Sequence, residues 1–163
     1  MCNFVRDEGG RYHTPPGGVE EQRILDEADR ILRSRYRRGR VLRNPVDARE
    51  MFRLRMAELK HEVFAVLFLD ARHRVIAYEE LFRGTIDGAS VHPREVARRA
   101  LETNAAAVVF AHNHPSGNPE PSEVDKSLTK RLRGALGLIE VRVLDHIVVG
   151  AEGAVSFAER GLL

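Results

Sequence analysis

The sequence is poor in cysteine. Cys2 is the single cysteine among 163 residues, and this excludes an internal disulfide framework. It also excludes a zinc site built only from thiolates. Any metal bound by this chain must therefore be held by histidine and carboxylate groups.

Long apolar runs are also missing. No stretch approaches the roughly 18 consecutive apolar residues of a membrane-spanning helix, and the N-terminus has no signal-peptide pattern. We therefore expect a soluble, cytoplasmic protein. Apolar residues make up 43% of the sequence and charged residues 31%, which is typical of a globular rather than a disordered chain. The length suits one compact domain with a short appendage.

The chain has little excess charge of either sign, but its basic residues are concentrated in one stretch. The formal net charge is only +2, although the sequence pI is about 9.0. The basic residues gather in one N-terminal stretch: Arg23, Arg30, Arg33, Arg35, Arg37, Arg38, Arg40 and Arg43. Such a stretch can contact the phosphate backbone of DNA, but it is also typical of a solvated helix face with ion pairs. Tyr36 is the single aromatic residue within it, which weakens an interpretation as a single-strand-binding surface.

The chain divides by pattern into two parts. Glycine and proline predict an irregular tail over residues 1–19, and apolar residues at helical spacing predict a helix over residues 20–36. Residues 1–40 are therefore expected to form a tail and an Arg-rich helix, and residues 41–163 a folded domain.

The second part alternates helices and strands. The helices are expected from Pro45 to about Leu59, from Pro93 to about Asn104 and from Ser122 to about Leu136. The strands are expected at Val63–Leu69, Val75–Phe82, Ala105–Ala111, Val141–Val149 and Ala154–Phe157. This alternation predicts an α/β fold with a mixed β-sheet sandwiched by helices.

Potential chemistry is concentrated in HNHPSGNPEPSEVD, residues 112–125. His112 and His114 are two apart at the end of a predicted strand, so their side chains can point the same way. Asp125 follows a Gly/Pro-rich loop that can bring the next helix back beside them. Two imidazoles and one carboxylate suit zinc and leave its fourth position open for water. Zinc can lower the pKa of that water to roughly 7.

A purely structural interpretation of the same residues stays open. Ser122 and Asp125 fit the N-cap and first turn of a helix. His112 could be a core histidine and His114 a surface one. The combined spacing, at a strand end and a helix start, favours the metal site.

A water-activating site also needs a base. Glu62 opens the buried run Val63–Leu69 and could face a metal-bound water, or it could be a solvated charge at a strand edge. Ser122 could donate a hydrogen bond to a developing oxyanion. His146 lies inside a strand pattern and is expected to be structural, whereas Asp145 could orient a neighbouring group.

Several segments resemble the RadC family of bacterial proteins over residues 41–163: EVFAVLFLD (62–70), ELFRGTIDGASVHPREV (80–96), NAAAVVFAHNHPSG (104–117) and VLDHIVVG (143–150). That family belongs to the JAMM/MPN+ metalloprotease-like superfamily, which includes zinc isopeptidases that remove ubiquitin-like tags. The resemblance implies the cytidine-deaminase-like architecture of JAMM (MPN) domains. It also implies zinc ligands at His112, His114 and Asp125, a general acid/base at Glu62 and an oxyanion-stabilising hydroxyl at Ser122.

The expected function is a zinc-dependent hydrolase that cleaves an amide or isopeptide bond in an unidentified protein or peptide. Two alternatives remain. One is a non-enzymatic, DNA-associated protein with a repair-related or mobile-element role, which would touch DNA weakly through residues 23–43. The other is a metal-dependent phosphoesterase. Longer RadC proteins carry an N-terminal helix-hairpin-helix region, whereas the short Arg-rich helix here resembles the short RadC-like proteins of mobile elements.

Overall fold

The computed structural model describes residues 5–6, 12–13, 21–35, 39, 41–42, 44–84 and 90–163. The chain forms two compact units, Met1–Arg37 and Arg38–Leu163. In the first unit, strand β1 (Val5–Arg6) pairs antiparallel with β2 (Tyr12–His13), and helix α1 spans Glu21–Arg35. The helix matches the prediction over residues 20–36. The tail was predicted to be irregular, but its described part contains these two short paired strands.

The second unit is built on a five-stranded sheet with the order β4-β3-β5-β6-β7. Its strands are β3 (Val63–Leu69), β4 (Val75–Arg83), β5 (Ala107–Asn113), β6 (Arg142–Gly150) and β7 (Gly153–Ser156). Strands β5 and β6 run parallel, and the other neighbouring pairs are antiparallel. The predicted α/β fold with a mixed sheet is therefore confirmed.

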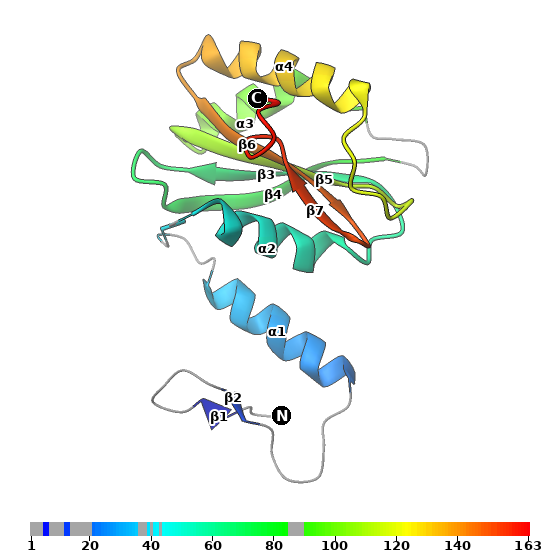
Figure 1. The fold of residues 1–163 in the computed structure, drawn as a ribbon. Coiled ribbons are helices and arrows are strands. Elements are labelled where there is room, and N and C mark those ends of the chain that lie inside the picture. The colour runs from blue at the N-terminus through cyan, green and yellow to red at the C-terminus, as the bar shows by residue number, and fades with distance from the viewer. Residues whose placement is uncertain are drawn as a thin grey trace. The chain divides into compact units, whose positions relative to one another are not determined.

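Helices cover both faces of this sheet (Figure 1). Helix α2 (Pro45–Met56) packs on one face, and α3 (Pro93–Glu102) and α4 (Glu123–Gly137) lie on the other. Every residue of β3 is buried because the strand is covered on both sides. Among the helices that the structure describes, none is long and apolar enough to cross a membrane.

The core between the sheet and helices α3 and α4 supports the end of β5. Phe64, Val66 and Phe110 pack there with Leu132 and Leu136 of α4. Burying a side chain of this size contributes roughly 1.5–3 kcal/mol. The face of β5 that carries the first histidine of the HxH motif is thereby held against α4.

Strand β5 is longer at its end than predicted. It was expected to stop at Ala111, but His112 pairs with Phe64 of β3 and with Val148 of β6, and Asn113 pairs with Val149. The prediction was wrong because it ended the strand where the apolar run ends, whereas backbone pairing on both sides continues. His112 therefore lies within the sheet and is only 2% exposed.

Candidate metal centre

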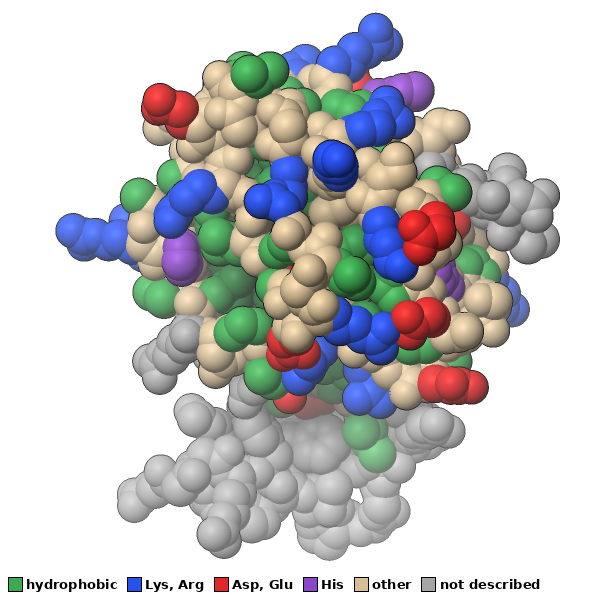
Figure 2. Space-filling model, turned by 45° about the horizontal axis from the view of Figure 1, so that its top comes forward, with side chains coloured by type: hydrophobic (Ala, Val, Ile, Leu, Met, Phe, Trp, Pro, Cys, Tyr) green, Lys and Arg blue, Asp and Glu red, His purple; other side chains and the backbone are tan. Residues whose placement is uncertain are grey.

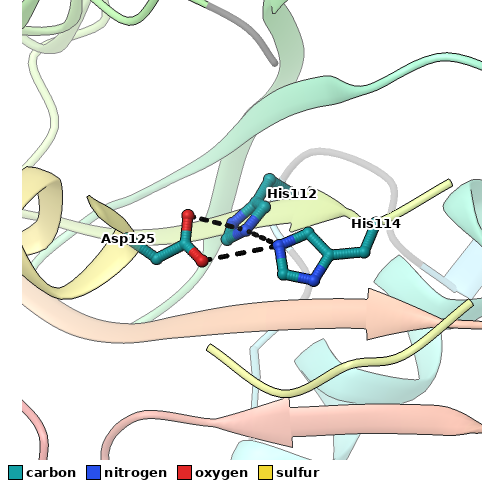
Figure 3. A group of neighbouring side chains, drawn as sticks. All are labelled: His112, His114 and Asp125. Carbon is teal, nitrogen blue, oxygen red and sulfur yellow. Dashed lines mark hydrogen bonds and ion pairs between the residues drawn. The ribbon is translucent and has the colours of Figure 1, made fainter. Parts of the chain in front are cut away.

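Three side chains meet at the end of β5, two from the strand end and the residue after it and one from the start of α4 (Figure 3). The Nε2 atoms of His112 and His114 lie 3.0 Å apart. Asp125, in the first turn of α4, places Oδ1 3.2 Å from Nε2 of His112 and Oδ2 3.4 Å from Nε2 of His114. The ligating atoms all lie within 4.8 Å of one another. The structure thus assembles the predicted His-His-Asp group in an arrangement that fits a metal ion.

The loop after β5 turns the chain back toward this group. The backbone N–H of His114 donates to the carbonyl of Val149 over 2.8 Å, so the loop starts against β6. Gly117 then adopts a positive φ of 89°, which glycine tolerates at little cost. The N–H of Gly117 donates to the carbonyl of His114 over 2.9 Å and closes this turn. Both histidines consequently face the start of α4.

Asp125 has a structural role and faces the histidines at the same time. Its Oδ2 accepts hydrogen bonds from the N–H and the hydroxyl of Ser122, each over 2.7 Å, while its own N–H donates to Ser122 Oγ. This reciprocal arrangement is a capping box. The helix cap and the metal site are therefore not alternatives. The cap fixes the carboxylate that the histidines face.

The electrostatics of the group favour an ionised carboxylate. Burial by itself raises the pKa of Asp125, but hydrogen bonds to His112, His114 and Ser122 outweigh it and hold the pKa far below its usual range. The pKa of His114 is raised, mainly by its hydrogen bond to Asp125. A negatively charged ligand set of this kind attracts a cation.

When its ring is neutral, His114 has its metal-facing nitrogen, Nε2, free of hydrogen. Its Nδ1 lies 2.9 Å from the backbone carbonyl of Asn118. A carbonyl can only accept, so Nδ1 carries the proton and donates it there. In the neutral imidazole, Nε2 then presents a lone pair toward Asp125 and His112. Such a backbone partner on the other ring nitrogen is typical of metal-binding histidines.

A family model for the RadC-like JAB domain matches residues 42–162. The chain belongs to this family. It is 57% identical over 143 residues to a UPF0758 protein of Vibrio cholerae, covering 88% of this chain and 90% of that protein. UPF0758 proteins of Marinobacter nauticus and Thioalkalivibrio sulfidiphilus are 59% and 61% identical over 89% and 87% of this chain. The matched part spans 65% and 63% of those two proteins. JAB domains are often metal-dependent hydrolases.

In this RadC-like domain, Glu62 immediately precedes β3. Its charge contributes to the raised pKa of His114, after the larger effect of the Asp125 hydrogen bond. Its carbonyl accepts a hydrogen bond from the N–H of Gly84 over 2.8 Å. The structure thus brings the carboxylate of Glu62 into electrostatic range of the His-His-Asp group, on a segment remote in sequence.

Asn113 holds the Glu62 segment against β5. Its Oδ1 accepts from the N–H of Val63 over 2.8 Å, and its Nδ2 donates to the carbonyls of Leu59 and His61. Helix α2 was predicted to reach about Leu59, but it ends at Met56 and the following residues turn toward Asn113. The residue between the two histidines therefore fixes the backbone on both sides of Glu62.

Asp145 and His146 both have buried partners. Asp145 accepts from the N–H of its neighbour His146 over 2.7 Å, from the hydroxyl of Ser156 over 2.6 Å and from the N–H of Ala158 over 3.0 Å. His146 is fully buried, as expected of a structural residue, and its Nε2 also lies 2.8 Å from Nδ1 of His112. The sequence feature that could have pointed to this contact is a histidine inside an otherwise apolar strand. The pairing of β5 with β6 places His146 next to Phe110.

Two other carboxylates, on or beside β3 and β4, are engaged elsewhere. Asp70 binds Arg74 within the β3–β4 turn, and Glu79 pairs with Arg99 of α3. Four arginines of the Arg-rich stretch, Arg37, Arg38, Arg40 and Arg43, lie outside the described residues. Within the described part, Arg30 forms an ion pair with Glu27 on α1.

Proposed function

We propose that this RadC-like domain is a zinc-dependent hydrolase that cleaves an amide or isopeptide bond in a protein or peptide. The observation that carries the proposal is the convergence of His112, His114 and Asp125 at the end of β5. Two histidines and one carboxylate match the donor set of catalytic rather than structural zinc sites. A bound zinc ion would polarise the scissile carbonyl and acidify a water molecule.

The distances within the group support zinc. Two ligand atoms at zinc–ligand distances of roughly 2.0–2.1 Å, separated by the tetrahedral angle, are about 3.3 Å apart. The two nitrogens here lie 3.0 Å apart, close to that value, and they lie 3.2 and 3.4 Å from two different oxygens of Asp125. With one ligand atom from each residue, all separations are within 4.8 Å. Three protein ligands leave the fourth position for water or substrate.

In this proposal Glu62 moves the proton. Its carboxylate takes the proton from the attacking water and passes it to the leaving amine. Ser122 stabilises the oxyanion of the tetrahedral intermediate. Its hydroxyl donates to Asp125 Oδ2 in the structure, so this role requires the hydroxyl to turn toward the substrate. The backbone N–H of Ser122 keeps its bond to the same carboxylate oxygen and would still hold Asp125 in place.

A cleft beside the start of α4 gives a protein substrate room to bind. It has a volume of about 580 Å³ and lies between the segment before α3 and the first two turns of α4. Val91 and Leu128 supply an apolar lining, and Arg131 supplies a charge. Figure 2, in which the top of Figure 1 comes forward, shows Lys and Arg side chains spread over the viewed face, with Asp and Glu side chains among them. A peptide in this cleft would pass Glu123 and Val124, the two residues before Asp125.

The test combines metal analysis with a hydrolysis screen. Purified wild-type protein is expected to contain about one zinc per chain and to release a product from a panel of peptides and isopeptides. Glu62→Gln should keep the zinc and lose turnover by at least about 100-fold, because a general base contributes roughly 10²–10⁴. His114→Ala should lose the zinc. Glu50→Gln, on the exposed side of α2, serves as the matched control and should retain both properties.

Two results would contradict the proposal. A fully active Glu62→Gln protein would show that another group is the base. Unchanged zinc content in His114→Ala would remove that residue from the ligand set. A nucleic-acid substrate is included in the panel, and hydrolysis of that substrate alone would identify a phosphoesterase instead.

A further inference from the structure

We propose that Thr129 and His146 are positioning residues that fix the tautomer of His112, so that its Nε2 always presents a lone pair to the metal. The inference rests on the proposed metal site for its purpose. Its evidence is a buried chain of hydrogen bonds behind the ligand. The chain runs from the backbone of α4, across β6, to the ring of His112 in β5.

The chain consists of three short contacts. The hydroxyl of Thr129 lies 2.6 Å from the backbone carbonyl oxygen of Asp125, one turn earlier in α4. The same oxygen, Oγ1, lies 2.6 Å from Nδ1 of His146. Nε2 of His146 lies 2.8 Å from Nδ1 of His112. Thr129, His146 and His112 are 1%, 0% and 2% exposed, so water does not compete for these bonds.

The carbonyl at one end fixes the direction of every proton. A carbonyl oxygen can only accept, so Thr129 donates its single hydroxyl proton to Asp125. Oγ1 must then accept from His146, which places the proton of that ring on Nδ1. A neutral imidazole carries one N–H, so Nε2 of His146 accepts from Nδ1–H of His112. The proton of His112 is thereby held on the side away from the metal centre.

The reverse direction does not satisfy the same contacts. If Thr129 donated to His146, Oγ1 and the carbonyl of Asp125 would face each other at 2.6 Å with no proton between them. His146 would then donate to His112 and push the proton of His112 onto Nε2. That nitrogen would point an N–H at the metal position and could not bind a cation.

The surroundings of His146 keep its ring neutral. Its ring centroid lies 4.8 Å from that of Phe157, 5.6 Å from Phe64 and 5.8 Å from Phe110. A charged imidazolium in this aromatic enclosure would be poorly solvated. The partner of His112 is thus a neutral ring rather than the carboxylate or carbonyl that usually supports a metal-binding histidine.

Asp125 consequently acts at both ends of the arrangement. Its carboxylate faces His112 and His114 directly, and its backbone carbonyl sets the proton of His112 through Thr129 and His146. The first turn of α4 therefore supplies the proposed ligand Asp125 and also sets the tautomer of the proposed ligand His112. This gives a role to the buried hydroxyl of Thr129 and the buried imidazole of His146.

The first experiment compares two variants of Thr129. Thr129→Val removes the hydroxyl and its directionality, and Thr129→Ser keeps both. In a competition with a zinc chelator, the affinity of Thr129→Val for Zn²⁺ should fall about 10–100-fold, the usual effect of losing a supporting partner. The Zn²⁺ affinity of Thr129→Ser should stay within about threefold of wild type, because this variant keeps the hydroxyl that supports His146. Circular dichroism and thermal unfolding of the metal-free proteins show whether each variant is folded.

The second experiment reads the tautomer without any metal. Nitrogen-15 NMR of metal-free, histidine-labelled wild type should show His112 and His146 protonated at Nδ1. Thr129→Val should show a mixture for both rings. This measurement separates the inference from the proposed function, because a wild type that bound no zinc could still show the expected tautomers.

The inference is overturned by either of two results. One is a wild-type His112 whose Nδ1 carries no proton in the metal-free protein, with the proton on Nε2 alone. The other is a folded Thr129→Val protein that binds Zn²⁺ as tightly as wild type. If Thr129→Val does not fold, the wild-type tautomers and the affinity of Thr129→Ser decide the question.

Discussion

At the scale of single residues, Asp125 joins helix capping to metal-site assembly. A carboxylate has two oxygens and about four lone-pair sites. Oδ2 accepts from Ser122, and Oδ1 faces His112. The capping box restricts the rotamer of Asp125 before any cation binds, so part of the ordering cost of a metal site is met when the domain folds.

The raised pKa of His114 predicts opposite pH dependences with and without metal. In the metal-free protein the His114–Asp125 bond favours protonated His114. Its contribution to stability is complete below the ordinary pKa of 6.5 and is lost as pH rises through the raised value. Metal binding requires the deprotonated ring, so affinity rises over the same interval. The increase in melting temperature caused by Zn²⁺ should therefore be small near pH 5 and large near pH 8.

The control for this pH dependence is Asp125→Asn in the metal-free state. Loss of the carboxylate removes the main cause of the shift, so the pKa of His114, followed by NMR, should move down toward 6.5. A Zn²⁺-induced change in melting temperature that stayed constant over this range would refute the coupling between His114 protonation and metal binding.

Local spacing in the sequence was sufficient to predict the His-His-Asp group. His112 and His114 share a face because of strand geometry, and Asp125 begins a helix that a short loop returns to them. His146 could not be assigned to the site in this way. It is 34 residues from His112, and their contact depends on β5 and β6 being parallel neighbours. Its pattern within β6 is that of an ordinary core position.

At the scale of elements, the end of β5 serves both faces of the sheet. Alternate side chains of a strand point to opposite sides. His112 faces α4, and Asn113 reaches across to the segment between α2 and β3. A single strand end therefore sets the positions of a proposed ligand and of the backbone that carries Glu62. His112 and Asn113 lie beyond the apolar run of β5, so the part of the strand that the run does not mark is the part that positions the site.

Asn113→Ala should damage stability and the proposed catalysis together. It leaves the buried N–H of Val63 and two carbonyls without their partner, and each such loss costs about 1–3 kcal/mol. Urea unfolding should show this decrease in the free energy of unfolding. Because Glu62 is released while both histidines remain, hydrolysis should fall more than Zn²⁺ affinity does.

Asn44→Ala is the matched control for Asn113→Ala. Asn44 caps α2 through the N–H of Asp47, at an exposed position, and its loss should cost about 1 kcal/mol. It should leave activity at wild-type levels after correction for the folded fraction. Equal losses of activity in the two variants would mean that Asn113 acts only through global stability.

At the scale of the whole molecule, the proposed site depends on the loop after β5 lying close to the turn between β6 and β7. Gly150 makes this approach feasible. A Cβ at that position would overlap the carbonyl oxygen of Gly117 and come within 2.8 Å of the backbone nitrogen of Pro119. Asn118, whose carbonyl holds the ring of His114, lies between those two residues. Packing at the far end of β6 thus controls a ligand on another segment.

Gly150→Ala should therefore weaken metal binding from a position outside the metal centre. The loop backbone must move to admit the methyl group, and the Asn118 carbonyl that orients His114 moves with it. We expect a loss of about 10-fold or more in Zn²⁺ affinity, measured by chelator competition, since partners of ligating histidines usually contribute this much. Gly134→Ala in α4 is the control, because its Cβ meets nothing within 4 Å. It should stabilise the helix by roughly 0.5–1 kcal/mol and leave the affinity unchanged. Equal Zn²⁺ affinity in Gly150→Ala and wild type would show that the loop is positioned by its own turn at Gly117 and not by the sheet.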